Sequence, residues 1–259
     1  MESAMSFLFS CSVDDGDPAD ARLADLLGWH GLRATFYLPI HNREGAPVMP
    51  PAQMRELGRH FEIGSHTYDH CFLPGLSAER AAFQIGQGKR VLEQILGQRV
   101  DGFCYPLGAY RQREIALVRD AGFAFARTTR NLWLEAGPDR YRMGTTCQFY
   151  PHGAAVFARN YVRGGHWRAR CHALRHALLE RDWEWRLYAL LDAAQRRGGV
   201  FHCWLHTRDI ERLGLWPALA AWCAHVAAVT PVHTRVTNGE LAERRFPATS
   251  HQDFLDVNC

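Results

Sequence analysis

The sequence lacks most of the features that mark secreted, membrane-spanning and nucleic-acid-binding proteins. Its eight cysteines form no CxxC pair and follow no regular spacing, which favours buried free thiols in a reducing compartment over a disulfide framework or a zinc ribbon. No basic segment with a long apolar core opens the chain, and the most apolar later stretch, 213–229, is interrupted by Pro217 and His225. We therefore expect no signal peptide, no integral membrane span and a cytoplasmic location.

The chain also has little excess charge and no internal repeat or low-complexity segment. A formal net charge of +3 is too small to indicate a nucleic-acid partner, although it suits an anionic substrate. What the chain does have is size and hydrophobic content. Its 259 residues, 47% of them hydrophobic, suffice for one large α/β domain or two small ones.

Strand and helix patterns alternate along the first half of the chain. Apolar runs predict strands at 5–11, 34–38, 61–65, 100–104 and 123–127, and the helical patterns between them, such as the one capped by Ser77, indicate a parallel sheet. After an insertion at 133–197 the pattern resumes with a strand at 200–205, a helix at 215–228, a strand at 232–236 and a helix capped by Asn238. We expect a single domain over residues 1–259, with a C-terminal tail at 246–259.

Two adjacent carboxylates follow the first predicted strand. Because side chains alternate across an extended backbone, Asp14 and Asp15 point apart, so one can bind a cation while the other stays free for proton transfer. The third strand leads into His66 and His70, which can close on one metal ion with Asp15 as the third ligand. Two histidines and one carboxylate leave coordination positions open, as catalytic sites do. Each motif alone also has an ordinary explanation, as loop acids or as surface or core histidines.

Two later strand ends carry further candidates. The turn 105–108 either terminates a strand or presents the backbone N–H of Tyr105 to an oxyanion. The strand at 200–205 ends at His206, a candidate for chemistry, whereas His202 is interpreted as a core residue. Trp204 shares the parity of His206, so it either walls the substrate pocket or packs in the core.

The insertion is rich in arginine and aromatic residues, and two helices are predicted in it, around 167–180 and 183–196. Its arginines indicate either a cationic cap, which holds a diphosphate or rests on an anionic membrane surface, or a solvated pair of helices with aromatic core contacts. A second histidine pair, His172 and His176, has no acid at a strand end nearby, and we interpret it as part of a helix surface.

Taken in order and at these intervals, the Asp-Asp-Gly turn, the His-x-x-x-His pair, the Pro-x-Gly turn and the late strand histidine resemble the polysaccharide deacetylase family, also called NodB-homology proteins or carbohydrate esterase family 4. The resemblance covers residues 5–130 and 198–244. It implies a distorted (β/α)7 barrel, a divalent metal (zinc, with iron, cobalt, nickel or manganese as alternatives) and hydrolytic removal of an N-acyl group from an amino sugar. It implies these roles: general base, Asp14; metal ligands, Asp15, His66 and His70; oxyanion N–H and substrate contact, Tyr105; general acid, His206.

The chain departs from that family pattern at three places. Cys104 stands where many members carry an arginine that tunes the base. Asp182-Trp183, inside the insertion, is only a partial match to the Asp-Trp motif that supports the catalytic histidine. Thr207 replaces the aspartate that often follows that histidine.

We therefore expect a metal-dependent hydrolase that removes an acetyl, or alternatively a formyl, group from an amino sugar during bacterial surface polysaccharide biosynthesis. Without an export signal, the expected substrate is nucleotide-linked or lipid-linked, with Trp204 beside it and peripheral membrane contact as an option. Two alternatives stay open: a catalytically silent glycan-binding relative, and a small-molecule amidase on the same barrel.

Overall fold

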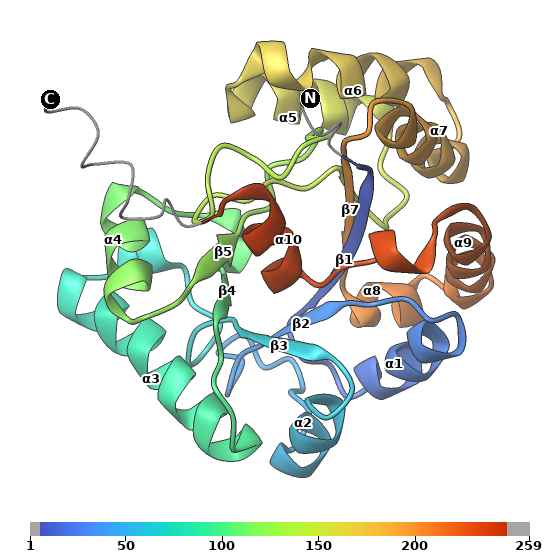
Figure 1. Ribbon diagram of the computed structural model, residues 1–259. Coiled ribbons are helices and arrows are strands. Elements are labelled where there is room, and N and C mark those ends of the chain that lie inside the picture. Colours follow the sequence, from blue (N-terminus) through green and yellow to red (C-terminus); the bar gives the residue numbers. More distant parts are fainter. Residues whose placement is uncertain (1–5, 248–259) are drawn as a thin grey trace, which may run out of the picture.

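Seven parallel strands form the centre of the computed structural model, which describes residues 6–247 (Figure 1). Their order across the sheet is β5-β4-β3-β2-β1-β7-β6, so the first strand lies in the middle. The sheet curls into a half-barrel with helices around it, which confirms the expected distorted (β/α)7 barrel. The strands are β1 Leu8–Asp14, β2 Thr35–Leu38, β3 Glu62–Ser65, β4 Gly102–Cys104, β5 Phe125–Arg127, β6 Cys147–Gln148 and β7 Val200–Leu205.

Helices follow most of the strands and pack around the curled sheet (Figure 1). The α-helices are α1 Asp20–Trp29, α2 Pro51–Leu57, α3 Ala78–Leu96, α4 Gln112–Asp120, α5 Ala154–Gly164, α6 Trp167–Leu179, α7 Trp183–Arg196, α8 Thr207–Arg212, α9 Trp216–Val229 and α10 Asn238–Arg245. Three 3₁₀ turns complete the described fold: η1 Leu73–Gly75, η2 Pro106–Gly108 and η3 Val232–Thr234. Ser77 caps α3 as predicted, since its side chain accepts a hydrogen bond from the Arg80 N–H.

The two faces of β1 differ in chemistry. Phe9, Cys11 and Val13 belong to the main hydrophobic cluster between the sheet and its helices. The alternate positions carry Ser10 and Ser12, which are hydrogen-bonded to the His202 ring at 2.7 Å and 3.0 Å. The prediction that His202 is a core residue is therefore confirmed. On this face of β1, Leu8 belongs to a smaller hydrophobic cluster, and the polar row that begins at Ser10 continues through Ser12 to Asp14 at the end of the strand.

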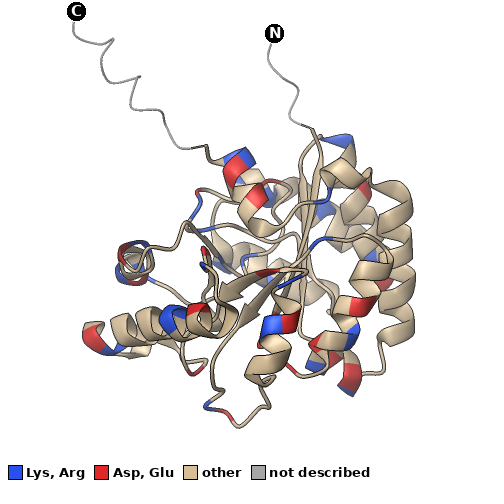
Figure 2. Cartoon of the chain, turned by 60° about the horizontal axis from the view of Figure 1, so that its bottom comes forward, with Lys and Arg blue, Asp and Glu red and all other residues tan. Residues whose placement is uncertain are grey.

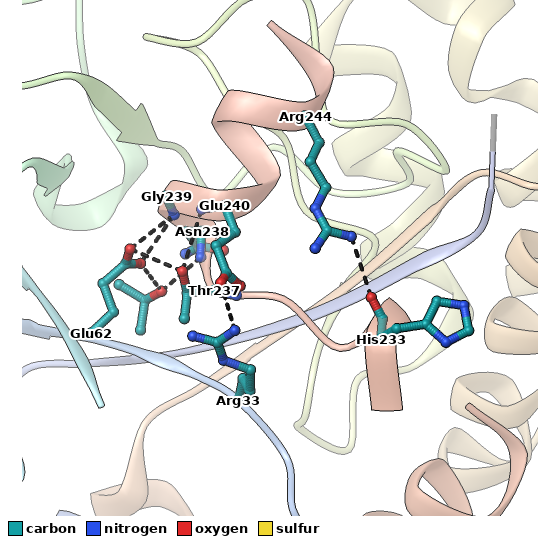
Figure 3. Close-up of polar contacts among 9 residues, drawn as sticks. Arg33, Glu62, His233, Thr237, Asn238, Gly239, Glu240 and Arg244 are labelled. Atoms are coloured by element: carbon teal, nitrogen blue, oxygen red, sulfur yellow. Dashed lines mark hydrogen bonds and ion pairs between the residues drawn. The ribbon is translucent and has the colours of Figure 1, made fainter. Parts of the chain in front are cut away.

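Charged residues are rare in the strands: only Asp14, Glu62 and Arg127 among them carry Asp, Glu, Lys or Arg side chains, and most of the charge lies on helices and loops (Figure 2). Glu62 faces the N-terminus of α10 (Figure 3). Its carboxylate accepts hydrogen bonds from the Gly239 N–H at 3.1 Å and from the Thr237 hydroxyl at 3.0 Å. A carboxylate at a helix N-terminus satisfies amide groups that have no partner within the helix.

Thr237, not Asn238, caps α10, and the prediction is wrong by one residue. The Thr237 side chain accepts from the Glu240 N–H, and the Glu240 side chain reaches back to Thr237 in a capping box. Asn238 is instead the first helical residue. Its side chain turns inward, where it donates to the Tyr37 hydroxyl at 2.9 Å and accepts from Arg127 at 2.6 Å.

The predicted strand at 232–236 is also wrong, because this segment begins with a 3₁₀ turn. The Thr234 N–H donates to Pro231 O at 3.0 Å and the Arg235 N–H to Val232 O at 3.1 Å. Amide groups used inside a turn cannot also extend a ladder. Instead of a strand, the segment forms a single β-bridge, in which Arg235 pairs with Phe9 of β1.

The structure confirms both helices predicted in the insertion, as α6 and α7, and adds two elements that the sequence pattern did not predict. One is α5. The other is β6, which pairs with β7 and therefore belongs to the sheet although it lies within the range assigned to the insertion. The helical part begins only at Ala154. Most of the predicted C-terminal tail, residues 248–259, lies outside the described residues.

Within residues 6–247, no helix combines the length and the apolar character needed to cross a membrane. The cysteines in this part of the chain are free thiols, and all of them except Cys171 are buried. Burial in strands and helices fits their interpretation as small hydrophobic residues.

Candidate active site

The predicted site residues gather at the carboxyl ends of neighbouring strands. Asp14 is the last residue of β1, His66 follows β3, and His206 follows β7. Adjacent parallel strands end at the same edge of a sheet, which brings these side chains together. The backbone turns sharply here, since Asp15 and His70 both have positive φ angles, 82° and 52°. Such conformations are costly for residues other than glycine and concentrate at functional sites.

Asp15, His66 and His70 form one cluster. The Asp15 Oδ1 atom lies 3.5 Å from His66 Nε2 and 3.2 Å from His70 Nε2. The His66 Nδ1–H donates to the Cys104 carbonyl at 2.8 Å, which leaves the Nε2 lone pair directed at the cluster. Burial favours neutral Asp15, but the two facing imidazoles outweigh it and lower the pKa of this carboxyl.

This cluster fits a divalent metal. One ligand atom from each residue lies within 4.8 Å of the others, and Asp15 Oδ1 is buried without a hydrogen-bond partner among the described residues. An orphaned buried carboxylate oxygen facing two imidazole nitrogens is costly unless a cation joins them. Two histidines and one carboxylate form the donor set of catalytic zinc and of related transition metals.

Asp14 lies beside this cluster with only 3% of its surface exposed. The Cys104 thiol donates to its Oδ2 at 3.5 Å, and its Oδ1 has no partner in the part of the chain that the structure describes. Burial raises the pKa of Asp14, and the nearby His66 and His206 offset only part of that rise. The carboxylate is therefore a stronger proton acceptor than an exposed aspartate.

His206 faces the same cluster from β7. Its Nε2 lies 3.7 Å from Asp15 Oδ2, and its Nδ1 lies 3.3 Å from Asp209 Oδ2. Although burial favours the neutral ring, the carboxylates of Asp209, Asp15 and Asp14 raise the pKa of His206 to about 9. The imidazole is thus protonated at neutral pH in this arrangement.

Asp209, which sequence reasoning missed, orients this imidazole. It lies in the first turn of α8, and the Arg212 guanidinium also donates to it at 2.8 Å. The hydrogen bond with His206 and the Arg212 contact lower the pKa of Asp209 to about 2, despite partial burial. An acid three residues after the strand-end histidine, where a helix begins, was the available sequence signal.

A second buried acid links the loops that carry these groups. Asp20, at the start of α1, accepts a hydrogen bond from the Thr207 hydroxyl at the start of α8. Burial raises the pKa of Asp20 well above its ordinary value, despite that hydrogen bond. The contact joins the loop after Asp14 and Asp15 to the residue that follows His206.

The predictions for Tyr105 are contradicted. Its N–H donates to Arg127 O at 3.2 Å as part of the contact between β4 and β5, so this amide is not available to an oxyanion. Its side chain is fully buried, with the ring 4.8 Å from Tyr110, and does not reach the surface where a substrate would lie.

The next amide along this turn belongs to Leu107, because Pro106 has no N–H. The hydrogen bonds of the turn run from Gly108 N–H to Tyr105 O and from Ala109 N–H to Pro106 O, and neither uses Leu107. Leu107 is 64% exposed with a φ of 58°. Gly108 is required behind it, because a Cβ there would lie 1.8 Å from Thr129 Oγ1.

Trp204 lies beside the cluster. Its ring centroid is 5.1 Å from that of His206 and the two planes are almost perpendicular, at 89°. The side chain is neither fully buried nor fully exposed. This position is the one expected for a residue that walls the pocket, and its contact with substrate stays a prediction.

Comparisons with known proteins agree with this geometry. The family model for polysaccharide deacetylase matches residues 8–126, which include Asp14, Asp15, His66 and His70. Residues 8–126 of the chain belong to the polysaccharide deacetylase family.

Among curated relatives, YxkH of Bacillus subtilis (strain 168), itself assigned to the polysaccharide deacetylases, is 25% identical over 101 residues, which are 39% of this chain and 36% of that protein. A chitin deacetylase of Pestalotiopsis sp is 34% identical over 91 residues, 35% of this chain and 30% of that enzyme. The matched region therefore spans about a third of the length of each relative.

Solved structures show the same fold over nearly the whole chain. A Mycobacterium smegmatis protein assigned to the polysaccharide deacetylases matches 95% of this chain and 92% of its own, with 18% identity and a TM-score of 0.62. The family 4 carbohydrate esterase from Streptomyces lividans, solved in complex with acetate, matches 85% of this chain and 89% of its own, with 14% identity and a TM-score of 0.52.

Two departures from the deacetylase pattern have a structural counterpart. Where the family resemblance leads one to expect an arginine, Cys104 has the buried Arg127 as its register partner on β5. The candidate Asp182 is not a support for His206, because it caps α7 through hydrogen bonds from the Glu184 and Trp185 N–H groups at 2.8 Å and 3.0 Å. Asp209 occupies the supporting position instead.

Two of the cavities in the described part of the chain bear on the location of the site. One of about 330 Å³ is lined by residues between and near the deacetylase histidines, among them Tyr68, Asp69 and Phe83. A larger one, of about 630 Å³, lies between α1 and α2 and is lined by residues at the starts of β2 and β3, such as Ala34 and Glu62. Since the site residues are at the opposite ends of these strands, the larger cavity lies away from the chemistry.

Proposed function

We propose that the protein is a metal-dependent deacetylase that hydrolyses the N-acetyl group of an amino sugar in a glycan. The observation that carries this proposal is the grouping of a buried carboxylate, Asp14, an Asp15–His66–His70 cluster and His206 with its raised pKa at one sheet edge. Amide hydrolysis needs an activated water, a stabilised oxyanion and a proton for the departing amine. The three parts of the site match these three needs.

Asp15, His66 and His70 would hold the metal, with zinc as the first choice and iron, cobalt, nickel or manganese as alternatives. A divalent ion there supplies a Lewis acid for the amide carbonyl and for the attacking water. The His66 Nδ1–H contact with the Cys104 carbonyl fixes the ring so that Nε2 remains a ligand atom.

Asp14 accepts a proton from the attacking water, for which its raised pKa suits it. The Leu107 N–H, the free amide of the turn after β4, donates to the oxyanion that forms at the carbonyl. His206 then gives its proton to the nitrogen as the C–N bond breaks. Acetate leaves, and the sugar keeps a free amine.

The proposed substrate class is a glycan used in surface polysaccharide biosynthesis, nucleotide-linked or lipid-linked. Exposed apolar side chains near the site, Phe72 at 50%, Phe83 at 54% and Leu107 at 64%, offer stacking surfaces for sugar rings beside the reacting one. The 330 Å³ cavity, lined in part by Tyr68 and Phe83, also carries the carboxylates of Asp69 and Glu79, which can accept hydroxyl hydrogens. The free thiols of the described residues support a reducing, cytoplasmic location.

A catalytically silent glycan-binding relative is the second candidate, and Cys104 in place of arginine is the observation that favours it. A thiol at 3.5 Å is a weaker partner for Asp14 than a guanidinium. Binding of acetylated oligosaccharides without acetate release, in metal-loaded protein, would select this candidate. A small-molecule amidase would instead release acetate or formate from metabolites but not from glycans.

The direct test is acetate release from N-acetylated oligosaccharides by zinc-loaded protein. We expect Asp14→Asn to lower kcat by about 10²- to 10⁴-fold, since it removes the general base. The matched control is Asp17→Asn in the same loop, where the carboxylate only accepts from the Ala19 N–H at 2.9 Å. Full turnover by Asp14→Asn on a competent substrate would eliminate this mechanism.

A further inference from the structure

The arginines of the insertion fall into two groups. Arg170 and Arg186 are buried and donate to backbone carbonyls: Arg170 reaches Gly165 O and Asn131 O, both at 2.8 Å, and Arg186 reaches Ala177 O at 2.7 Å. These two side chains fasten the helices to each other and to the barrel. A different environment surrounds the other arginines between residues 154 and 181, which are all exposed: Arg159, Arg163, Arg168, Arg175 and Arg181.

The outward side of α6 combines these cations with exposed apolar groups. Trp167 is 57% exposed, Leu178 45% and Leu179 67%. With 100° between successive residues, the exposed side chains other than Ala169 fall within an arc of about 120° of the helix. We call this the α6 face: Trp167, Arg168, Cys171, Arg175, Leu178 and Leu179.

The apolar groups at the start of this face are held outward. The Trp167 indole N–H donates to Val162 O at 3.3 Å, and the Tyr161 hydroxyl donates to Trp167 O at 3.0 Å. Val162 itself is 67% exposed beside them. An exposed tryptophan fixed by hydrogen bonds loses little conformational entropy when a partner covers it.

We propose that the α6 face docks on an anionic lipid membrane. Between residues 154 and 181 Glu180 is the only carboxylate, so the surface attracts anionic headgroups and repels a second copy of itself. A soluble polyanion would bind the arginines but would leave the exposed leucines without an apolar partner, whereas a membrane provides partners for both. Helices that lie in the interface of a bilayer typically combine arginines, whose aliphatic stems lie along the apolar surface, with Trp and Leu side chains.

Docking there would also place the catalytic edge near the membrane. The C-terminal end of α6 adjoins the start of α7, where Arg186 donates to His152 O at 2.8 Å, in the loop that leaves the carboxyl end of β6. This is the edge of the sheet that carries His206. A lipid-linked glycan could then reach the site; this consequence rests on the proposed function, whereas docking itself does not.

The test is co-sedimentation of the full chain with vesicles of phosphatidylcholine, with and without one part in four of phosphatidylglycerol. We expect binding only to the anionic vesicles, and weaker binding as salt screens the charges. Each arginine near a charged surface contributes about fivefold to the partition coefficient, so Arg168→Glu/Arg175→Glu should lower it by at least about 25-fold. Trp167→Ala should weaken binding without changing its salt dependence.

Matched controls exist on other helices. Arg59→Glu/Arg119→Glu makes the same charge change at side chains that are 71% and 63% exposed, and Trp29→Ala removes a tryptophan that is 86% exposed at the end of α1. Both control proteins should bind like the wild type. Thermal unfolding of every variant separates lost docking from lost folding.

Equal binding to neutral vesicles, or wild-type binding by Arg168→Glu/Arg175→Glu, would overturn the proposal. So would light scattering that shows a dimer disrupted by that variant, because a second copy would then cover the face. The variant should still release acetate from soluble oligosaccharides at the wild-type rate. Vesicle binding without any acetate release would refute the proposed function and leave the docking surface intact.

Discussion

Asp209→Asn should lower the pKa of His206 and move the alkaline limb of the pH–rate profile to lower pH. In the proposed mechanism His206 is the general acid, so activity should fall as the pH rises through its pKa. In the folded protein that pKa is raised to about 9, with the Asp209 contact at 3.3 Å first among the favourable causes. An asparagine keeps the size of the side chain and a hydrogen-bond acceptor but removes the negative charge.

The size of the shift follows from the exposure of the pair. A nearby opposite charge moves a pKa by about 1 to 3 units. We expect the effect of Asp209 on the pKa of His206 to be at the lower end of this range, because 23% of the Asp209 side chain is exposed and Asp209 also forms an ion pair with Arg212. About one unit corresponds to about 1.4 kcal/mol, or a roughly tenfold lower kcat on the alkaline side. Metal content should not change.

The assay is kcat against pH for the zinc-loaded enzyme, with Asp182→Asn as the control. Asp182 belongs to the insertion and caps α7, and an asparagine caps a helix about as well, so this variant should keep its stability and leave the pH profile unchanged. Asp209→Glu should restore part of the shift. An unchanged alkaline limb and unchanged kcat in Asp209→Asn would refute the assignment of this carboxylate to His206.

Substitutions at three further positions have defined outcomes. Cys104→Ser keeps a donor facing Asp14 and should retain kcat within about threefold, whereas Cys104→Ala should lower it by about tenfold, measured at saturating substrate. Asp15→Asn should lower bound zinc to a small fraction of one equivalent by elemental analysis, and stoichiometric zinc would exclude it as a ligand. Thr237→Val breaks the capping box with Glu240 and should lower the melting temperature by about 2–4 °C, with kcat unchanged.

The sequence predicted the parts of the site that depend on strand ends. Asp14, His66 and His206 each follow an apolar run, and the parallel arrangement that brings such ends together is a general property of alternating strands and helices. Local sequence patterns were sufficient to predict these residues, because each strand end contributes one side chain and the parallel sheet brings the strand ends together. The central strands and most helices were predictable for the same reason.

The errors occur where a backbone amide has two alternative partners. The Tyr105 N–H was expected to be free, but the pairing of β4 with β5 directs it to the Arg127 carbonyl. The amides of Thr234 and Arg235 were expected in a ladder, but a 3₁₀ turn uses them. Both outcomes depend on how segments distant in the sequence are placed relative to each other. The hydrophobic periodicity of the sequence carries no information about that placement.

Asp209 was missed for a related reason. The family pattern directs attention to an Asp-Trp pair, and the only one in the insertion, Asp182-Trp183, serves as a helix cap. An aspartate in the first turn of a helix is ordinarily a stabilising residue for that helix. Only the 3.3 Å contact with the His206 ring distinguishes the two roles of Asp209.

A buried arginine, Arg127, offers a reason why a cysteine at position 104 is compatible with the proposed function. Arg127 lies opposite Cys104 in the sheet, and its guanidinium is held by the Gly144 carbonyl and by Asn238, which also binds Tyr37. Burial lowers the pKa of Arg127, while the nearby Tyr37, Cys104 and Asp14 act to raise it. A fixed buried cation thus acts electrostatically on the residues around Asp14, while the small Cys104 side chain occupies the contact position itself. The resemblance leads one to expect an arginine next to the proposed base, Asp14, and in this chain the buried cation lies one strand away, on β5.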